Sequence, residues 1–325
     1  MSLADWADVV LVAPTTYNII GKIANGIADD MLSTVISATT KPVFFALAMN
    51  VNMYNNPILQ ENIKKLKKYN YKFIDADEGL LACNYVAKGR LKDEKAIVDE
   101  LERFEICSKF ENYSTLLAGK KILISGGRTK EKIDPVRYIT NNSSGKMAYS
   151  LAQASADLGA EVTLISGPCE LEIPTNINKF KKVDSASEMY EEINSEFKNT
   201  DIFISCAAVA DYTPKEYSTK KIKKADGDLF IELKRTKDIL FEMGQQKEKQ
   251  FLVGFAAETN DIKENALKKL KKKNLDMIVA NSALTMSSDM SSVEIIGKNE
   301  TSIEILNKTK LEIAYEILKQ ISKKI

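Results

Sequence analysis

Short apolar runs alternate along the chain with longer stretches in which apolar residues recur at helical spacing. The runs at residues 7–13, 121–125 and 201–209 are rich in β-branched residues and have the length of buried strands. Amphipathic stretches such as residues 60–69 and 261–273 separate such runs and have the periodicity of helices. Repeated strand–helix units of this kind predict an α/β protein with doubly wound, mostly parallel sheets.

The C-terminal part contains two segments that add to this alternation. Residues 229–233 form another apolar run, which we interpret as a strand. Residues 293–296 and 302–305 are two short β-rich runs on either side of Gly297, and they predict a terminal hairpin.

Residues 109–118 interrupt the alternation, because they have mixed polarity and no clear period. We place a domain boundary there and predict two domains, residues 1–110 and residues 119–325, for which the chain is long enough. The first apolar run, residues 7–13, follows Met1 closely. A sheet rarely begins with so little before it, so we expect an upstream part of the first domain to be missing.

The connection between residues 121–125 and the next helix is unusually long. It spans about eighteen residues, whereas a crossover loop usually has about two to six. Gly126 and Gly127 end the strand, and Gly145 and Lys146 open the helix. Glycines let a main chain approach a ligand closely, and a helix N-terminus favours an anion. We predict a ligand-binding loop centred on the glycine pair; an ordinary crossover with a long loop is the alternative.

Composition narrows the classes of function. Forty-six basic and 45 acidic residues give a net charge of +1, so no overall field attracts nucleic acid. No apolar run reaches about eighteen residues, so we expect no membrane span. The four cysteines lie far apart without metal-ligand spacing, which indicates a cytoplasmic protein with reduced thiols. The sequence has no histidine, which excludes histidine-dependent catalysis and histidine metal sites within it.

Polar side chains gather near the ends of the strands that we predict in the second domain. Most are cations, and Asp211 is an acidic residue among them. The set comprises Arg137, Asn141, Asp211, Lys221, Lys223, Lys224, Lys237, Asp238, Lys269 and Lys273. Several cations, with an acidic residue able to hold a metal or a sugar hydroxyl, suit a nucleoside triphosphate with Mg²⁺.

Two common nucleotide motifs are absent. The chain lacks GxxxxGK[ST], which excludes a P-loop, and its glycine pair does not match GxGxxG. A nicotinamide-dependent reductase on the same architecture therefore lacks its fingerprint. Lysine runs are usually solvated helix faces, and we favour that interpretation for Lys263, Lys268, Lys271 and Lys272.

Five ordered motifs in residues 119–325 closely resemble the ligase half of the bacterial bifunctional coenzyme A biosynthesis flavoprotein. They read DPVRYITNNSSGKMAYSLAQASADLGAEVTLISGP, SCAAVADY, KIKK, VGFAAET and KKNLDMIVAN. In that family this half is a CTP-dependent phosphopantothenate–cysteine ligase with a Rossmann-like domain. The first segment resembles the other half, a phosphopantothenoylcysteine decarboxylase that contains FMN. Its matching motifs are SLADWADVVLVAPTT, IANGIADDMLST, AMNVNMYNNP and LLACNYVAKGR.

The resemblance implies a two-step reaction. The carboxylate of 4′-phosphopantothenate attacks the α-phosphate of CTP, which releases pyrophosphate and leaves an acyl-cytidylate; the amino group of cysteine then displaces CMP. By their places in the motifs, Asn141 would hold the acyl group with Arg137 beside it, and Lys221 would neutralise the α-phosphate. Asp211 would bind the nucleotide or its Mg²⁺. Cationic side chains and oriented donors meet these demands without a histidine.

The resemblance also implies a set of nucleotide-binding residues. It comprises Ser205, Cys206, Ala207, Asp211, Lys221, Lys237, Asp238, Ile239, Leu240, Phe255, Lys269 and Lys273. The chain departs from the family at Lys237, where the family usually has proline. Cys206 follows a strand, and we expect it to pack rather than to react.

For the first segment the resemblance implies a second site. Cys83 would be the proton donor to the enethiol intermediate, and Asn50 would bind the substrate carboxylate. The family's catalytic histidine lies immediately before the motif that opens this chain, where Met1 and Ser2 stand. We therefore predict a flavoprotein-like domain that is truncated at its N-terminus, does not decarboxylate unaided and does not hold FMN stably.

Two classes of function remain. One is an active CTP-dependent ligase with a residual flavoprotein segment, and it would form a homo-oligomer because ligase halves of the family pair as dimers. The other is a non-catalytic binding or regulatory subunit of a flavoprotein decarboxylase assembly. The presence of Asn141, Asp211 and Lys221 favours the ligase.

Overall fold

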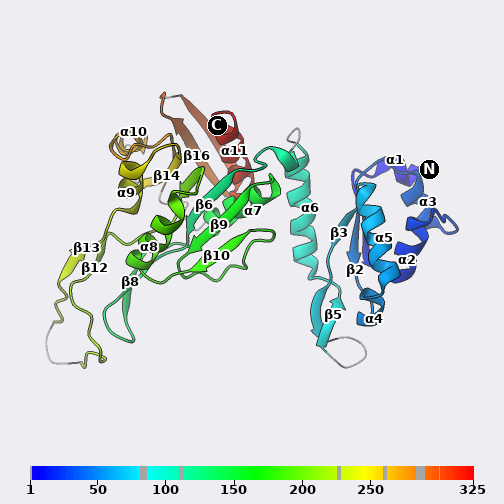
Figure 1. Cartoon of the computed structure of the whole chain (residues 1–325), viewed down its shortest axis with the longest axis horizontal. Coiled ribbons are helices and arrows are strands. Elements are labelled where there is room, and N and C mark those ends of the chain that lie inside the picture. The colour runs from blue at the N-terminus through cyan, green and yellow to red at the C-terminus, as the bar shows by residue number, and fades with distance from the viewer. Residues whose placement is uncertain are drawn as a thin grey trace. The chain divides into compact units, whose positions relative to one another are not determined.

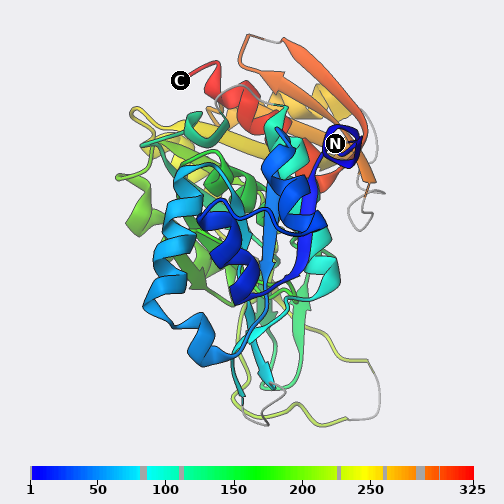
Figure 2. The same ribbon diagram turned by 90° about the vertical axis from the view of Figure 1, so that its right-hand side faces the viewer.

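The computed structural model of the chain describes residues 2–80, 86–109, 113–224, 228–258, 262–282, 290–299 and 301–325. The chain divides into two compact units, Met1–Glu105 and Ile106–Ile325 (Figure 1 and Figure 2). The division lies within helix α6 (Glu94–Ser108), just before the stretch in which the sequence predicts a boundary. Each unit has mixed α/β structure around a mostly parallel sheet, which confirms the predicted fold class.

Unit Met1–Glu105 is built on a parallel sheet with the strand order β1-β2-β3. Its strands are β1 (Val10–Thr15), β2 (Val43–Leu47) and β3 (Lys72–Ile74). Its helices before α6 are α1 (Ser2–Trp6), α2 (Tyr17–Ala24), α3 (Met31–Ala38), α4 (Val51–Tyr54) and α5 (Pro57–Lys68). Phe45 packs among α2, α3 and α5, whereas Phe44 packs against Ile97 of α6 on the opposite face. Because helices cover both faces, β2 is buried along its whole length.

An antiparallel pair, β4 (Asp77–Leu80) and β5 (Val86–Arg90), follows this sheet. The amide of Met49 donates a hydrogen bond of 3.0 Å to the carbonyl of Gly89, which ties β5 to the loop after β2. Residues 81–85 connect the two strands, and the predicted proton donor Cys83 therefore lies outside the described residues.

Unit Ile106–Ile325 contains an eight-stranded sheet in the order β10-β9-β6-β11-β14-β15-β16-β17. The strands are β6 (Lys121–Gly126), β9 (Glu161–Ser166), β10 (Lys179–Lys182), β11 (Ile202–Ser205), β14 (Phe251–Glu258), β15 (Met277–Ser282), β16 (Met290–Gly297) and β17 (Ser302–Thr309). Neighbours from β10 to β15 are parallel, and β16 and β17 return antiparallel around Gly297. The predicted terminal hairpin is thereby confirmed.

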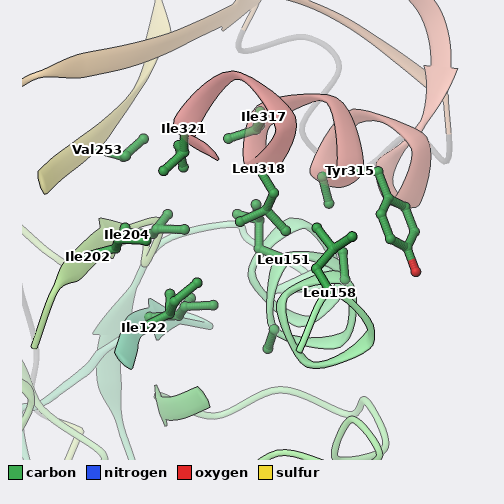
Figure 3. Packing of buried hydrophobic residues seen from close by; sticks show 14 of the residues in the cluster. Ile122, Leu151, Leu158, Ile202, Ile204, Val253, Tyr315, Ile317, Leu318 and Ile321 are labelled. Atoms are coloured by element: carbon green, nitrogen blue, oxygen red, sulfur yellow. The ribbon is translucent and has the colours of Figure 1, made fainter. Parts of the chain in front are cut away.

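Helices cover both faces of this sheet, as a doubly wound fold requires. They are α7 (Lys146–Asp157), α8 (Ala186–Phe197), α9 (Ile239–Gln246), α10 (Ile262–Lys272) and α11 (Lys310–Ser322). On one face Leu151 of α7 and Leu318 of α11 pack with Ile204 of β11 (Figure 3). On the other face α8, α9 and α10 share a second core with the sheet, for example through Met243. Within the described ranges, no helix is long and apolar enough to cross a membrane.

Two sequence-based predictions for this unit need correction. The long loop after β6 contains two short strands, β7 (Lys130–Lys132) and β8 (Tyr138–Thr140), which pair antiparallel. The strand predicted at residues 229–233 is wrong in its bounds, because the strand observed is β13 (Leu233–Arg235). Among the described residues, β13 pairs with β12 (Tyr212–Pro214) alone. It is exposed along its length, so its apolar residue Leu233 lies outside the core.

Candidate functional site

The site lies where the direction of strand addition in the sheet reverses. The chain continues from β6 to β9 on one side and, after β10, crosses to β11 on the other. In open parallel sheets, ligands bind beyond the carboxyl ends of the strands at such a switch point. Here the two strand-end segments run side by side, since the amide of Ala208 donates 2.9 Å to the carbonyl of Gly127.

A cavity of about 460 Å³ opens beside the end of β11. Its lining comes from the ends of β11 and β13, the start of α9, β14 and the end of α10. The lining residues are Ser205, Ala207, Val209, Asp211, Tyr212, Arg235, Thr236, Lys237, Asp238, Ile239, Leu240, Phe255, Lys269 and Lys273. Every nucleotide-binding residue that the sequence predicts is in this set, except Cys206 and Lys221. Parallel strands thus bring together side chains that are far apart in the sequence.

The lysines of the cavity are held in place by acceptors. The ammonium of Lys273 lies 2.8 Å from Oδ1 of Asp238, and that of Lys269 donates 2.6 Å to the carbonyl of Phe255. Asp238 also caps α9 by accepting from the amide of Phe241 at 3.1 Å. Burial tends to raise the pKa of Asp238, but the hydrogen bonds from Lys273 and Phe241 outweigh it and hold that pKa below its usual value.

Cations outnumber carboxylates in the lining of this cavity. The described lining contains the cations Arg235, Lys237, Lys269 and Lys273, and its carboxylates are Asp211 and Asp238. The ammonium of Lys237, which stands where the family usually has proline, lies 4.1 Å from the centroid of the Tyr190 ring. This cation–π contact fixes the segment that leads into α9. An excess of fixed positive charge in a concave site favours a polyanion such as a nucleoside triphosphate.

Asn141 follows β8 and reaches the rim of the same cavity. Its side-chain amide donates a hydrogen bond of 3.0 Å to the carbonyl of Val209, a lining residue. The long loop after β6 is therefore linked to the strand-end segment of β11, as the predicted role of Asn141 requires.

Arg137 is engaged elsewhere. Its Nε donates 3.0 Å to Oδ2 of Asp134, and its Nη2 donates 2.8 Å to the carbonyl of Ile222. The side chain of Asp134 is fully buried, and the Arg137 guanidinium together with three main-chain amides holds its pKa well below the usual range. The pair joins the turn before β8 to the lysine-rich loop around Lys221. Lys221 itself is exposed and, among the described residues, does not line the cavity.

Cys206 lines a second, smaller cavity of about 80 Å³. Ser143, Ser144, Gly145, Lys146, Met147, Ala148, Phe255, Asn281, Val293 and Lys310 complete its lining. Burial raises the pKa of the Cys206 thiol to about 12, and Cys206 packs against the core of the sheet. Phe255 lines both cavities, which makes them neighbours.

The smaller cavity contains polar residues that the sequence does not indicate as site residues. Lys310 is only 7% exposed, and its ammonium donates 2.6 Å to Oγ of Ser291. Gly145, with φ of 79°, caps the N-terminus of α7 beside Lys146. The glycine that opens the helix is a sequence signal for this end of the site. Asn281 and Lys310 carry no such signal, because they approach only when β15, β16 and β17 fold back on the sheet.

A metal site made by protein ligands alone is absent among the described residues, since no three His, Cys, Asp or Glu side chains converge. Asp211 lines the cavity of about 460 Å³ beside β11, called the main cavity below. Mg²⁺ usually binds nucleotide phosphates with only one or two carboxylates, so Asp211 fits a magnesium–nucleotide complex.

In the first unit, the predicted substrate ligand Asn50 caps the short helix α4. Its Oδ1 accepts 2.8 Å from the amide of Asn52. The second predicted residue of this site, Cys83, lies outside the described residues.

The reversal of strand order and the cationic cavity beside it define unit Ile106–Ile325 as a Rossmann-like, ligand-binding α/β domain. The family model "DNA/pantothenate metabolism flavoprotein C-terminal domain" matches residues 117–325, and the model "Flavoprotein" matches residues 1–105. The chain is 49% identical over 323 residues to the coenzyme A biosynthesis bifunctional protein CoaBC of Bacillus subtilis (strain 168), covering 98% of this chain and 79% of that one. It is 48% identical over 322 residues to the protein of the same name from Borreliella burgdorferi, and this match covers 98% of this chain and 80% of that protein.

A solved structure agrees with these relatives. The crystal structure of the C-terminal domain of a coenzyme A biosynthesis bifunctional protein CoaBC superimposes with a TM-score of 0.57 at 46% identity. The superposition covers 65% of this chain and 97% of the solved domain. The chain belongs to the family of bifunctional coenzyme A biosynthesis proteins, which confirms the resemblance seen in its motifs.

Proposed function

We propose that unit Ile106–Ile325 is a phosphopantothenate–cysteine ligase of coenzyme A biosynthesis that uses CTP. One observation carries the proposal: all but two of the predicted nucleotide residues line one cationic cavity, and Asn141 is hydrogen-bonded to its rim through Val209. The same cavity would not be needed by a purely regulatory subunit.

In the first step a carboxylate oxygen of 4′-phosphopantothenate attacks the α-phosphorus of CTP. The bond from that phosphorus to the oxygen bridging the β-phosphate breaks, and pyrophosphate leaves. Two negatively charged groups must approach, so the step depends on fixed cations. Lys269 and Lys273 supply such charge from the wall of the cavity, and Lys221 supplies it from the loop tied down by Arg137 and Asp134.

In the second step the neutral amino group of cysteine attacks the acyl carbon of the acyl-cytidylate. The carbon–oxygen bond to the phosphate breaks, CMP leaves and one proton passes to solvent. Charge develops on the acyl oxygen in the transition state, and Asn141 would stabilise it by hydrogen bonding. The contact with Val209 fixes the side-chain amide before the substrate arrives, which is preorganisation.

The polyphosphate tail of CTP would extend toward the smaller cavity. This cavity combines the N-terminus of the twelve-residue helix α7 with Lys146 and Lys310. A helix N-terminus and two lysines are chemically suited to phosphate oxygens. Phe255, which lines both cavities, would separate the base and ribose from the tail. Mg²⁺ bound at Asp211 would neutralise phosphate charge in the complex.

We extend the proposal to a homodimer formed through the β12–β13 arm. The arm lies apart from the eight-stranded sheet of its own unit (Figure 1). Large apolar side chains are exposed on it, and Phe230 is 90% exposed. The set is Tyr212, Tyr217, Leu229, Phe230, Ile231 and Leu233. Several large apolar side chains exposed on one arm are typical of a protein–protein interface.

The test is pyrophosphate release by the full chain with 4′-phosphopantothenate and CTP. The proposal predicts release with CTP and formation of an amide product when cysteine is added. If the wild-type chain releases no pyrophosphate, the ligase proposal fails. If ATP supports faster turnover than CTP, the nucleotide assignment fails.

A further inference from the structure

Arg128 is a cation of the β6 end that the proposed function has not used. Its main chain runs beside the segment after β11: Ala208 bridges it in parallel register, and the amide of Thr129 donates 3.3 Å to the carbonyl of Ala208. The neighbours of Ala208, Ala207 and Val209, line the main cavity. The main chain of Arg128 is thus next to Ala208, whose two neighbours in the chain line that cavity.

The side chain of Arg128 approaches a residue that lines the other cavity. Its Nη1 lies 3.5 Å from the carbonyl oxygen of Ser143, at the limit of a hydrogen bond. Ser143 lines the smaller cavity together with Lys146 and Lys310. One guanidinium nitrogen therefore lies next to a lining residue of the smaller cavity. Arg128 itself is not among the described lining residues of either cavity, so the site for a phosphate is beside this wall.

The guanidinium is poorly satisfied by protein groups. Within the part of the chain that the structure describes, its Nε is buried and meets no hydrogen-bond acceptor. A buried donor of a charged group without an acceptor is costly and calls for an explanation, such as an ion or ligand. Arginine presents several donors in a planar fork that matches phosphate oxygens.

Close main-chain packing holds Arg128 in this place. A Cβ atom on Gly167 would lie 2.1 Å from the carbonyl oxygen of Arg128, and one on Gly127 would lie 2.5 Å from the carbonyl oxygen of Gly167. The loops after β6 and β9 therefore touch through glycines, and this contact leaves the Arg128 main chain little freedom to shift.

We propose that Arg128 is a phosphate-binding residue, whose guanidinium binds a phosphate group beside the wall of the smaller cavity. The inference deepens the proposed function and rests on it for the identity of the nucleotide. Pyrophosphate is both the tail of CTP and the leaving group of the first step, so Arg128 would stabilise the tail before and after the bond breaks. An alternative role is purely positional, in which Arg128 only holds the Ser143 carbonyl and hence the loop that carries Asn141.

Two variants separate these roles. Arg128→Gln keeps a side-chain donor for the Ser143 carbonyl but removes the charge, whereas Arg128→Lys keeps the charge. Lys268→Gln is the control, because Lys268 is an exposed cation on α10 that pairs with Glu264 and does not line either cavity in the described part of the chain. Calorimetry on the full chain then measures binding of inorganic pyrophosphate and of CTP at fixed ionic strength.

Phosphate binding by Arg128 predicts that Arg128→Gln weakens pyrophosphate binding by about tenfold or more, as for the loss of a charge-assisted hydrogen bond. Arg128→Lys should lose less, and Lys268→Gln should bind like wild type. Equal pyrophosphate binding by wild type and Arg128→Gln overturns the inference, and so does an equal loss in Lys268→Gln. These readouts need no turnover, so they are independent of whether the ligase reaction itself is observed.

Discussion

The side-chain amide of Asn141 donates a hydrogen bond of 3.0 Å to the main-chain carbonyl of Val209. This contact joins the loop after β6 to the wall of the cavity, and it makes the position of Asn141 depend on the end of β11. Asn141→Asp replaces the donor by a carboxylate that repels the Val209 carbonyl and the developing negative charge of the acyl oxygen. We expect the rate of amide formation to fall by about 10²–10³-fold, as when an oxyanion donor is removed.

The matched control for this variant is Asn142→Asp, which adds the same charge one residue along the chain. Steady-state assays of amide formation compare the two variants at saturating CTP. Similar losses in both would mean that general negative charge in the loop causes the effect, and the specific role of Asn141 would be contradicted.

Lys273 and Asp238 form the second relationship that can be tested. Lys273→Met removes the ammonium but leaves the partly buried carboxylate of Asp238 at the cap of α9. Lys273 gives the largest of the interactions that lower the pKa of Asp238, so that pKa should rise when Lys273 is replaced. We also expect the KM for CTP to rise by about tenfold, the factor for about 1.4 kcal/mol.

The control is Lys272→Met, since Lys272 is the exposed neighbour at the end of α10. Carboxyl-carbon NMR reports the pKa of Asp238, and initial rates report the KM for CTP. An unchanged KM for CTP in Lys273→Met would contradict the placement of the nucleotide in this cavity.

Asp134 should make stability depend on pH. Its pKa is depressed in the folded protein, because Arg137 and the main-chain amides of Val136, Ile222 and Arg137 stabilise the carboxylate. A carboxylate with a depressed pKa stabilises the folded protein at pH values above the ordinary carboxyl pKa of about 3.9. This stabilisation is lost as the pH falls from there toward the pKa of Asp134 in the folded protein. Thermal unfolding from pH 7 to pH 3 should therefore show a steeper loss of stability in wild type than in Asp134→Asn. Parallel profiles for the two proteins would count against this assignment.

An alanine at Gly127 should be destabilising both because of its positive φ and because there is no space for a Cβ atom. Gly119 shares the positive φ but not the lack of space, so it serves as the comparison. Gly127 has φ of 70°, and a Cβ atom there would lie 2.5 Å from the carbonyl oxygen of Gly167. Gly119 has φ of 74°, but nothing lies within 4 Å of its added Cβ. Gly119→Ala should cost about 1–2 kcal/mol from the left-handed conformation alone. Gly127→Ala should cost more, because main-chain atoms must also move.

Urea unfolding of both alanine variants measures this difference, with pyrophosphate binding as a second readout for the proposed phosphate site of Arg128. Equal stability of the two variants would show that the loops after β6 and β9 can separate freely. The close approach would then not hold Arg128.

The sequence predicts the sheet of the second unit well, because β6, β9 and β11 are short apolar runs buried on both faces. It fails at residues 229–233, whose apolar character belongs to the exposed arm rather than to the core. An apolar run in a sequence shows that its burial is favourable. It does not show whether the run is buried in the core of its own chain or against a second chain. Interface strands and core strands therefore look alike before the fold is known.

In the site, the residues close to strand ends can be predicted from the sequence. The residues that reach the site through the antiparallel strands β16 and β17 cannot. Asp211 and Lys237 follow or precede recognisable elements, whereas Lys310 begins the last helix and reaches the site only after β15, β16 and β17 have assembled. The glycine pair at Gly126 was predicted as the centre of a binding loop. In the structure both glycines serve close packing: Gly127 lies against the main chain of Gly167, and Gly126 lies against the Ala148 side chain of α7.

A rapid-mixing experiment on the full chain without cysteine tests the two-step mechanism through an acyl-cytidylate. Enzyme, 4′-phosphopantothenate and CTP are mixed, quenched and analysed for pyrophosphate and for the mass of the acyl-cytidylate. The account predicts a burst of pyrophosphate that matches the amount of acyl-cytidylate, followed by CMP and amide when cysteine is added. Release of inorganic phosphate with CDP, or absence of the acyl-cytidylate at every time point, would contradict it.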